Sequence, residues 1–263
     1  MRNVKVAMHV NPFCEPIVKH NGPVINEPKG SIQRVLGQNP PEVVFGYGCQ
    51  EDMDTYWVNW KKYAKVVPFP TAGDSTIYYP EPKPDLTCEV AFVGGRWAYK
   101  AKTMDTYLVP VLKRFESRVY GWGGWQGHPY YKGPIEDPRV RKVLSSAKVG
   151  PSISESHTMK YGIDIPERIF KVPLCGTATF SEPIFGLQRF FPKDVMPTAS
   201  SPQEYMKICG ELINNDAQRQ ELAKKQREYV LNNHTYHHRV EALLLASGFA
   251  EEANRVKQAL VSK

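Results

Sequence analysis

Strand-forming segments alternate with helical ones along most of this chain, and the alternation limits the folds open to it. In the N-terminal part, apolar strand patterns cover residues 4–10, 43–47 and 64–69, and a helical pattern covers residues 52–63. Strands that alternate with helices are typical of a parallel sheet with helices packed on its faces. The sequence therefore predicts an α/β protein.

The same alternation returns after residue 85. Strand patterns cover residues 90–93, 118–120 and 148–153, and helical patterns cover residues 103–115 and 138–146. Pro110 falls inside the first of these helices, and because an interior proline removes a hydrogen bond we expect a kink or a late start there. A proline-rich stretch at residues 70–84 separates the two series and predicts a boundary after residue 84.

The C-terminal part is helical. Ser201, Pro202 and Glu204 combine an N-cap serine, a proline at the first helical position and a glutamate at the third, which is a strong helix-start signal. Further helical patterns cover residues 216–231, 237–246 and 250–261. We expect one α/β half over residues 1–84, a second over residues 85–245 and a C-terminal helix over residues 246–263.

Charge and composition favour some partners for this protein and argue against some kinds of site. The formal charge of +7 and the pI of about 9.0 favour an anionic partner, such as nucleotide phosphates, nucleic acid or an acidic membrane surface. The five cysteines stand singly, which argues against a disulfide framework and a zinc knuckle. No apolar run approaches the roughly 20 residues that cross a bilayer. We expect a soluble, cytoplasmic protein.

One charged helix is followed by a predicted buried strand. Glu167 and Lys171 are four residues apart and share a helical face, with Arg168 beside them. Gly176 ends the helix, and residues 177–180 are strand-forming. The segment suggests a nucleotide-sugar site, although an ordinary charged helix has the same pattern.

A second candidate is a glycine turn. Gly94 and Gly95 follow the strand at residues 90–93, and Arg96, Lys100 and Lys102 surround the turn with positive charge. Glycines allow backbone N–H groups to approach a phosphate closely, so this turn is a candidate diphosphate cradle. A simple tight turn remains the alternative.

Several other chemistries lack support. No Gly-x-x-x-x-Gly-Lys-Ser/Thr loop and no Gly-x-Ser-x-Gly elbow occurs, and the histidines have no metal-ligand spacing. Residues 121–127 resemble a dinucleotide fingerprint, but Gln126 takes the place of the third glycine. Trp57, Trp60 and Tyr63 interleave with lysines as in single-strand nucleic-acid binders, yet their spacing also fits the buried face of a helix.

Seven motifs occur in the order found in one enzyme family. They are residues 69–74 with Tyr79 and Pro80, residues 89–94, residues 119–122, residues 131–135, residues 167–170, residues 174–176, and residues 233–239. This set, spanning roughly residues 66–245, resembles the CgeB-like (spore-protein) glycosyltransferases and, more distantly, the phage DNA glucosyltransferases.

The resemblance implies a GT-B architecture of two Rossmann-like halves, whose second half binds a nucleoside-diphosphate sugar, with a UDP-sugar favoured. It implies that Gly94, Gly95 and Arg96 face the diphosphate and that Gly133, Pro134 and Ile135 hold the base. Arg168 would contact phosphate, and Lys100, Glu167, Lys171, Gly176 and Thr177 would complete the site. Arg168 and Arg96 would stabilise the leaving group, and the expected enzyme is a hexosyltransferase that needs neither metal nor cofactor.

Two departures from the family pattern keep alternatives open. Lys171 stands where the family has the glutamate that binds the ribose, and Glu167 is one turn earlier on the same face. The N-terminal half is shortened, so a homo-oligomer or a partner chain could complete it. Candidates for handling the acceptor hydroxyl are His9, Glu15 and Asp74. The acceptor itself is open among a modified DNA base, a glycan, a lipid and a protein, and a nucleotide- or nucleic-acid-binding protein without transfer activity is the alternative function.

Overall fold

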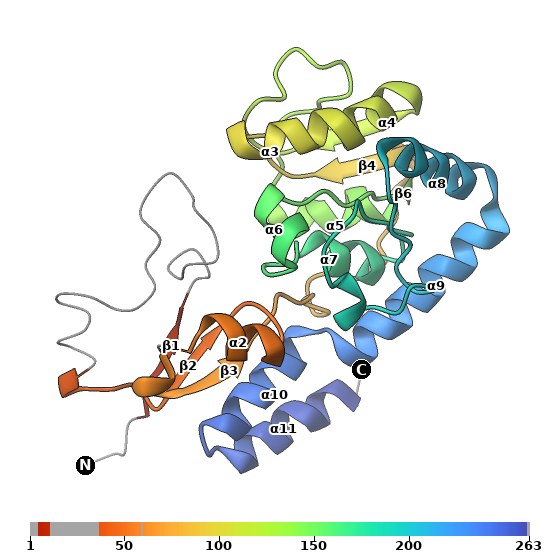
Figure 1. The fold of residues 1–263 in the computed structure, drawn as a ribbon. Coiled ribbons are helices and arrows are strands. Elements are labelled where there is room, and N and C mark those ends of the chain that lie inside the picture. The colour runs from red at the N-terminus through yellow and green to blue at the C-terminus, as the bar shows by residue number, and fades with distance from the viewer. Residues whose placement is uncertain (1–4, 11–36, 59, 262–263) are drawn as a thin grey trace. The chain divides into compact units, whose positions relative to one another are not determined.

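The computed structural model of the protein describes residues 5–10, 37–58 and 60–261 (Figure 1). The chain forms two compact units. The first draws on residues 1–71, 163–165 and 236–263, and the second comprises residues 72–162 and 166–235. The divisions expected from the sequence after residues 84 and 245 stay predictions.

The first unit contains a parallel sheet of three strands. β1 (Ala7–His9), β2 (Val43–Gly46) and β3 (Lys65–Pro68) pair in the order β1-β2-β3. In its described residues this unit includes the helices α2 (Gln50–Tyr56), α10 (Tyr236–Ala246) and α11 (Ala250–Val261) and the 3-10 turn Trp60–Lys62. The helix expected over residues 52–63 is therefore wrong in its second half. Trp57 and Trp60 are nevertheless both buried, which supports the core interpretation of these aromatic residues over the nucleic-acid one.

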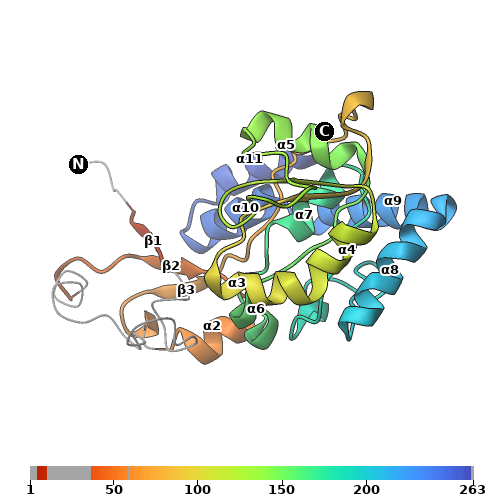
Figure 2. The ribbon, with the colours of Figure 1, turned by 90° about the horizontal axis from the view of Figure 1, so that it is seen from above.

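The second unit contains the other parallel sheet. β4 (Cys88–Val93) is its central strand, between β5 (Ser117–Tyr120) and β6 (Ala147–Val149). Figure 1 shows α3 (Ala98–Thr103) and α4 (Val109–Arg114) on one side of β4 and α5 (Asp137–Ser145) on the other, and Figure 2 shows the same arrangement from above. Val90, Ala91 and Phe92 of β4 are fully buried, as expected of a central strand covered on both faces, and this explains the continuous apolar run at residues 90–93. The predicted α/β fold with two parallel sheets is confirmed.

The expected disturbance at Pro110 takes the form of a π-helix. Met104–Leu108 forms this wider turn between α3 and α4, and Pro110 follows in the first turn of α4. A π-turn changes the hydrogen-bond spacing locally, so the missing N–H of a proline interrupts no regular α-helical bond. The helical run consequently starts earlier than predicted and passes through the proline.

The second unit also contains four α-helices, α6 (Ser156–Tyr161), α7 (Arg168–Leu174), α8 (Pro202–Asn214) and α9 (Asp216–Asn233), and the short 3-10 helices Pro84–Leu86 and Leu187–Arg189. The expected N-cap is confirmed, because the Ser201 hydroxyl accepts the amide of Glu204 at 3.2 Å. A core of buried side chains from β4, the π-helix and α8 includes Phe92, Leu108 and Tyr205. The helical character of the C-terminal part is confirmed.

The strand predicted over residues 177–180 is wrong. Ala178 makes an isolated bridge to Val149, and the peptide groups of Thr179 bond to the buried side chain of Gln226 instead of a neighbouring strand. The amide of Thr179 donates to Gln226 Oε1 at 2.9 Å, and Gln226 Nε2 donates to the Thr179 carbonyl at 2.7 Å. β6 also ends at Val149, before the predicted residue 153.

Candidate functional site

Three glycines stand where the strands of the second sheet end. Gly94, Gly121 and Gly150 follow β4, β5 and β6, and because these strands are parallel, the loops after them lie at one edge of the sheet. The Gly94 amide donates to the Tyr120 carbonyl at 2.9 Å. A Cβ atom at Gly121, whose φ is +138°, would clash with the Gly94 carbonyl. Ligands of open α/β sheets bind at this edge.

Arg168 lies at the same edge and is fixed by backbone carbonyls. Its Nε and Nη2 donate to the Val93 carbonyl at 3.3 and 2.8 Å, and Nη1 donates to the Ile153 carbonyl at 3.2 Å. The guanidinium carbon is 4.1 Å from the ring centre of Phe92. No carboxylate of the described residues pairs with it directly. A guanidinium has more N–H donors than these carbonyls use, so donors on Nη1 and Nη2 remain for a ligand.

Burial lowers the pKa of Arg168 to about 10, partly opposed by the electrostatic interactions with Tyr205, Glu182 and Glu167, in that order. The side chain is therefore still protonated at neutral pH. A positively charged group without a direct carboxylate partner attracts anions, and a planar guanidinium fits the oxygens of a phosphate well.

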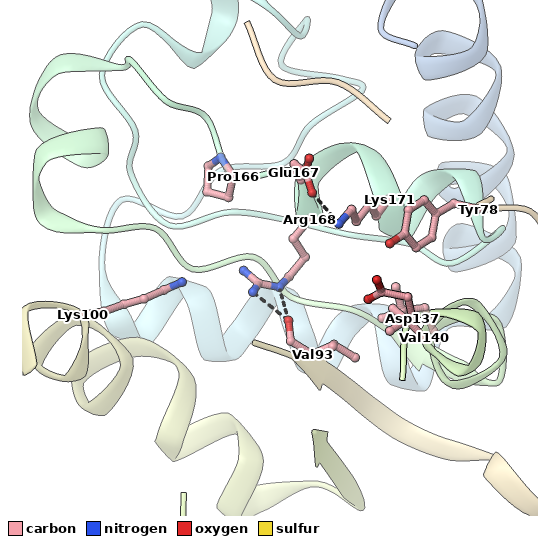
Figure 3. A pocket seen from close by; sticks show the side chains of 10 residues that line it. Tyr78, Val93, Lys100, Asp137, Val140, Pro166, Glu167, Arg168 and Lys171 are labelled. Atoms are coloured by element: carbon pink, nitrogen blue, oxygen red, sulfur yellow. Dashed lines mark hydrogen bonds and ion pairs between the residues drawn. The ribbon is translucent and has the colours of Figure 1, made fainter. Parts of the chain in front are cut away.

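A cavity of about 320 Å³ opens beside Arg168 (Figure 3). In Figure 3 the side chain of Lys100 extends from α3 with its amine toward the guanidinium of Arg168, which comes from α7. The cavity is lined by Tyr78, Val93, Lys100, Asp137, Val140, Leu144, Pro166, Glu167, Arg168 and Lys171. Four of the residues expected in the nucleotide-sugar site, Lys100, Glu167, Arg168 and Lys171, thus surround one cavity.

Lys171 is engaged by two neighbours in this cavity. Its amine forms an ion pair with Glu167, one helical turn earlier, and lies 4.9 Å from the ring centre of Tyr78. Burial lowers the pKa of Lys171, but the charge and the hydrogen bond of Glu167 outweigh burial, and the net pKa is raised. The pairing holds the Glu167 carboxylate at the cavity wall.

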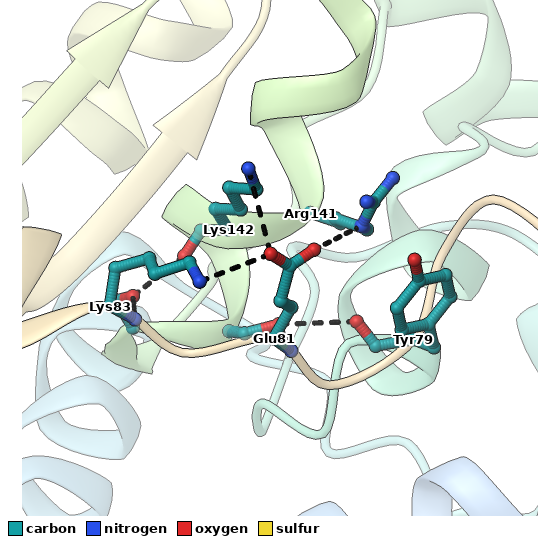
Figure 4. Close-up of polar contacts among 7 residues, drawn as sticks. Tyr79, Glu81, Lys83, Arg141 and Lys142 are labelled. Atoms are coloured by element: carbon teal, nitrogen blue, oxygen red, sulfur yellow. Dashed lines mark hydrogen bonds and ion pairs between the residues drawn. The ribbon is translucent and has the colours of Figure 1, made fainter.

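An ion cluster ties the segment that carries Tyr78 to α5 (Figure 4). Glu81 Oε2 accepts Arg141 Nε at 2.7 Å, and its other oxygen pairs with Lys83 at 3.2 Å and Lys142 at 3.5 Å. The Glu81 amide donates to the Ser145 hydroxyl at 3.0 Å. Because Asp137 and Val140 of α5 also line the cavity, this cluster fixes two of its walls relative to each other.

Arg96 makes its contacts elsewhere. Its guanidinium forms a two-point ion pair with Asp105, with Nη2 2.8 Å from Oδ1 and 2.6 Å from Oδ2. A Cβ atom at Gly95 would clash with the ring of Trp97, which covers this glycine. Arg96 and Gly95 do not line the cavity beside Arg168, whereas Gly94 is in contact distance of the Arg168 guanidinium.

The expected base-binding loop lines a second cavity. This space, of about 370 Å³, is bounded by Tyr120, Lys132, Pro134, Ile135, Glu136 and Arg139. Gly133 has a φ of +103°, which favours glycine, and its carbonyl accepts the amide of Gly121 at 3.1 Å. This bond joins the loop to the edge of the sheet.

None of the other expected residues that the structure describes lines either cavity. Gly176 has a φ of +79° and ends α7, as predicted, and the Thr177 hydroxyl donates to the Leu144 carbonyl at 2.7 Å. His9 belongs to the first unit, where its ring lies 5.0 Å from that of Tyr47. Burial lowers the pKa of His9, and the charge of Asp164 opposes this. Asp74 accepts the amide and hydroxyl of Thr76 in a local turn, and Glu15 is outside the described residues.

The sequence interpretation missed the two other polar side chains that line the first cavity, Tyr78 and Asp137. Asp137 had an available signal, because it directly precedes Pro138 at the start of a helical pattern, where acidic residues are favoured. Tyr78 had no comparable signal, since its position depends on the Glu81 cluster.

Carboxylates of the described residues form no cluster that could hold a metal. No group of three or more His, Cys, Asp or Glu side chains there has the required arrangement. An Asp-x-Asp sequence occurs in α2, where the Asp52 carboxylate accepts the amide of Cys49 and Asp54 pairs with Lys61. Within the described part of the chain, no helix combines the length and the apolar character that a membrane span needs.

Solved structures share this fold. Sucrose-phosphate synthase from Thermosynechococcus elongatus aligns with a TM-score of 0.56 and 16% identity, over 84% of this chain and 59% of that one. The T4 phage β-glucosyltransferase in complex with UDP-glucose aligns with a TM-score of 0.55 and 15% identity, over 80% and 63%. A mutant of TarM from S. aureus in complex with UDP aligns with a TM-score of 0.64 and 13% identity, over 94% and 51%.

At these identities the likeness shows the fold, which is of the GT-B kind. This chain spans between 51% and 63% of the length of the three structures. No curated protein sequence matches it. The profile of the glycosyl transferase-like family matches residues 103–245, more than half of the chain, and the chain therefore belongs to this family of glycosyltransferases.

Proposed function

We propose that the protein transfers a sugar from a nucleoside-diphosphate sugar to an acceptor hydroxyl, with the diphosphate bound between Arg168 and Lys100. The observation that carries this proposal is the Arg168 guanidinium, which is fixed on the Val93 and Ile153 carbonyls and keeps N–H donors for a ligand in the cavity. An anchored cation needs little reorganisation when its ligand arrives.

The chemistry of transfer explains why cations belong at this place. As the bond between the anomeric carbon of the sugar and the diphosphate breaks and the acceptor oxygen bonds to that carbon, negative charge develops on the departing diphosphate. Donors already fixed around that charge lower the barrier, and a single one contributes about 3–4 kcal/mol. Arg168 and Lys100 are the proposed donors, and Arg96, whose charge is paired with Asp105, is proposed to hold the glycine turn in place.

Glu167 is the proposed ribose ligand. Lys171 occupies the family's usual glutamate position, but its ion pair holds the Glu167 carboxylate at the wall of the same cavity. Hydrogen bonds from hydroxyls to a carboxylate are stronger than bonds between neutral groups. We further propose that Gly133, Pro134 and Ile135 bind the base in the neighbouring cavity and that Gly94, Gly95, Gly176 and Thr177 shape the donor site.

UDP-glucose is the first donor to test. Both the T4 phage β-glucosyltransferase and TarM structures contain a uridine diphosphate group in their complexes. Hexosyl transfer without a metal and CgeB-like specificity are parts of the same proposal. His9 is the proposed group for the acceptor hydroxyl, because an imidazole with a lowered pKa is neutral and can accept a proton.

The second candidate is a nucleotide-binding protein without transfer activity. Lys171 favours it, because this lysine stands where the family has the glutamate that binds the ribose of the donor. The acceptor is a separate question, and one acceptor class can be tested by binding alone. A modified base in DNA predicts an affinity for duplex DNA whose logarithm falls linearly with the logarithm of salt concentration.

The experiment is incubation of the purified protein with UDP-glucose and measurement of released UDP. We expect slow hydrolysis by the wild-type protein and none above background by Arg168→Ala. Arg255→Ala, which removes an exposed arginine of α11, is the control and should match the wild type. The second candidate would be supported by a protein that binds UDP but forms no UDP from UDP-glucose, with or without added acceptors.

A further inference from the structure

The peptide group between Ile153 and Ser154 connects Arg168 to a second, fully buried side chain. Its carbonyl accepts Arg168 Nη1 at 3.2 Å, and its N–H donates to Glu182 Oε1 at 2.5 Å. In a trans peptide the carbonyl and the N–H point in opposite directions. Glu182 and Arg168 therefore bind the two ends of one rigid plane.

The Glu182 carboxylate takes the place of a backbone acceptor. The amides of Gly150 and Ser152 donate to the carbonyls of Ala178 and Phe180, at 3.0 and 2.9 Å. The next amide in this alternating series donates to the Glu182 side chain. The carboxylate thus extends the series by one bond, to the peptide whose carbonyl holds the guanidinium.

Burial makes this arrangement costly. Glu182 is 0% exposed, and its second oxygen accepts the Ser181 hydroxyl at 3.1 Å. Removing a carboxylate from water is unfavourable unless hydrogen bonds or charges compensate it. In the described residues no cation pairs with Glu182 directly, and the charge that acts on Arg168 from Glu182 does so across the peptide.

We propose that Glu182 is a positioning residue for the donor site. It fixes the Ile153–Ser154 peptide so that the carbonyl holds Arg168 with its remaining N–H groups available to the diphosphate. A direct ion pair between the two side chains would occupy those N–H groups. The ligand in this inference, a diphosphate, rests on the proposed function. The hydrogen bonds that link Glu182 to Arg168 through the peptide are present without a ligand.

The test is a double-mutant cycle on UDP affinity, measured by calorimetry. Glu182→Ala removes the acceptor and should weaken binding about tenfold, whereas Glu182→Gln retains an acceptor oxygen and should stay within about threefold of the wild type. In an Arg168→Lys background, Glu182→Ala should change affinity less than about threefold, because lysine lacks the guanidinium fork that the peptide holds.

Tyr205→Phe is the matched control, since it removes a buried hydrogen bond to the neighbouring carbonyl of Ser152, at 2.7 Å. It should lower the melting temperature while leaving UDP affinity within about twofold. Equal effects of Glu182→Ala in both backgrounds, or an equal loss of affinity in Tyr205→Phe, would overturn the proposal.

A wild-type protein that binds neither UDP nor UDP-glucose would reject the proposed function but leave this inference open to a second measurement. The same double-mutant cycle is then measured as the free energy of unfolding, obtained by denaturant titration of the wild type, the two single variants and the double variant. We expect the effects of Glu182→Ala and Arg168→Lys to be non-additive. Additive effects would show that the two side chains do not act on one peptide.

Discussion

Gly94 and Arg168 are so close that a Cβ atom at position 94 would clash with Nη2 of the arginine. The ring of Phe92 lies on the same side, 3.1 Å from that Cβ position. The glycine is therefore required by the guanidinium and not by its own backbone angles, since its φ is not positive.

Gly94→Ala should consequently displace the Arg168 guanidinium from the Val93 carbonyl while the fold stays intact. We expect UDP affinity to fall at least about tenfold, the loss of one charge-assisted hydrogen bond, with little change in melting temperature. Gly210→Ala on α8 is the control, because the nearest atom to its new Cβ is at an ordinary 3.7 Å. Equal UDP affinities of Gly94→Ala and the wild type would show that this contact has no part in binding.

The edge of the second sheet was predictable from local patterns, and the anchoring of Arg168 was not. Short apolar segments followed by glycines at 94, 121 and 150 indicate the ends of parallel strands. The carbonyls of Val93 and Ile153 hold Arg168 from residues far away in the sequence, and any residue type could supply a carbonyl. No side-chain pattern can therefore reveal them.

Long-range side chains also explain the wrong strand at residues 177–180. Its composition is strand-forming, but the amide of Gln226, from α9, satisfies the peptide groups of Thr179. Arg96 is a second case in which a side chain from another element decided the outcome. Its position beside the glycine turn predicted a phosphate contact, and its two-point pairing with Asp105 depends on the helical run after the turn.

The ribose preference tests the proposed role of Glu167. The wild-type protein should bind UDP at least about tenfold more tightly than 2′-deoxy-UDP, because a hydroxyl bonded to a carboxylate contributes about 1.5–3 kcal/mol. Glu167→Gln should reduce this preference to less than about threefold. Glu211→Gln, which changes an exposed carboxylate of α8 that pairs with Lys207 outside the cavity lining, is the control and should retain the preference. A preference that Glu167→Gln leaves intact would assign the ribose to another residue.

The stability of the protein should depend on pH through Glu182. Burial raises the pKa of this carboxyl above its ordinary value of 4.5, although hydrogen bonds from Ser154 and Ser181 oppose the shift. The folded state therefore binds its proton more tightly than the unfolded state, and this part of the stability is lost as pH rises from about 4.5 through the higher folded pKa.

Glu182→Gln cannot titrate and provides the reference. Over that pH range, the wild type should lose up to about 1.4 kcal/mol of unfolding free energy per pH unit relative to this variant. Urea denaturation at a series of pH values from 4 upward measures the difference. A difference that stays constant with pH would mean that the carboxyl titrates normally in the folded protein.

Calorimetric titration of UDP into the wild-type protein and Arg168→Ala tests the central claim most directly. Loss of a charge-assisted, two-point donor to phosphate should weaken binding by about tenfold to a hundredfold, with the melting temperature measured in parallel to verify folding. An unchanged affinity in a folded Arg168→Ala protein would contradict the claim that this guanidinium binds the diphosphate of the donor.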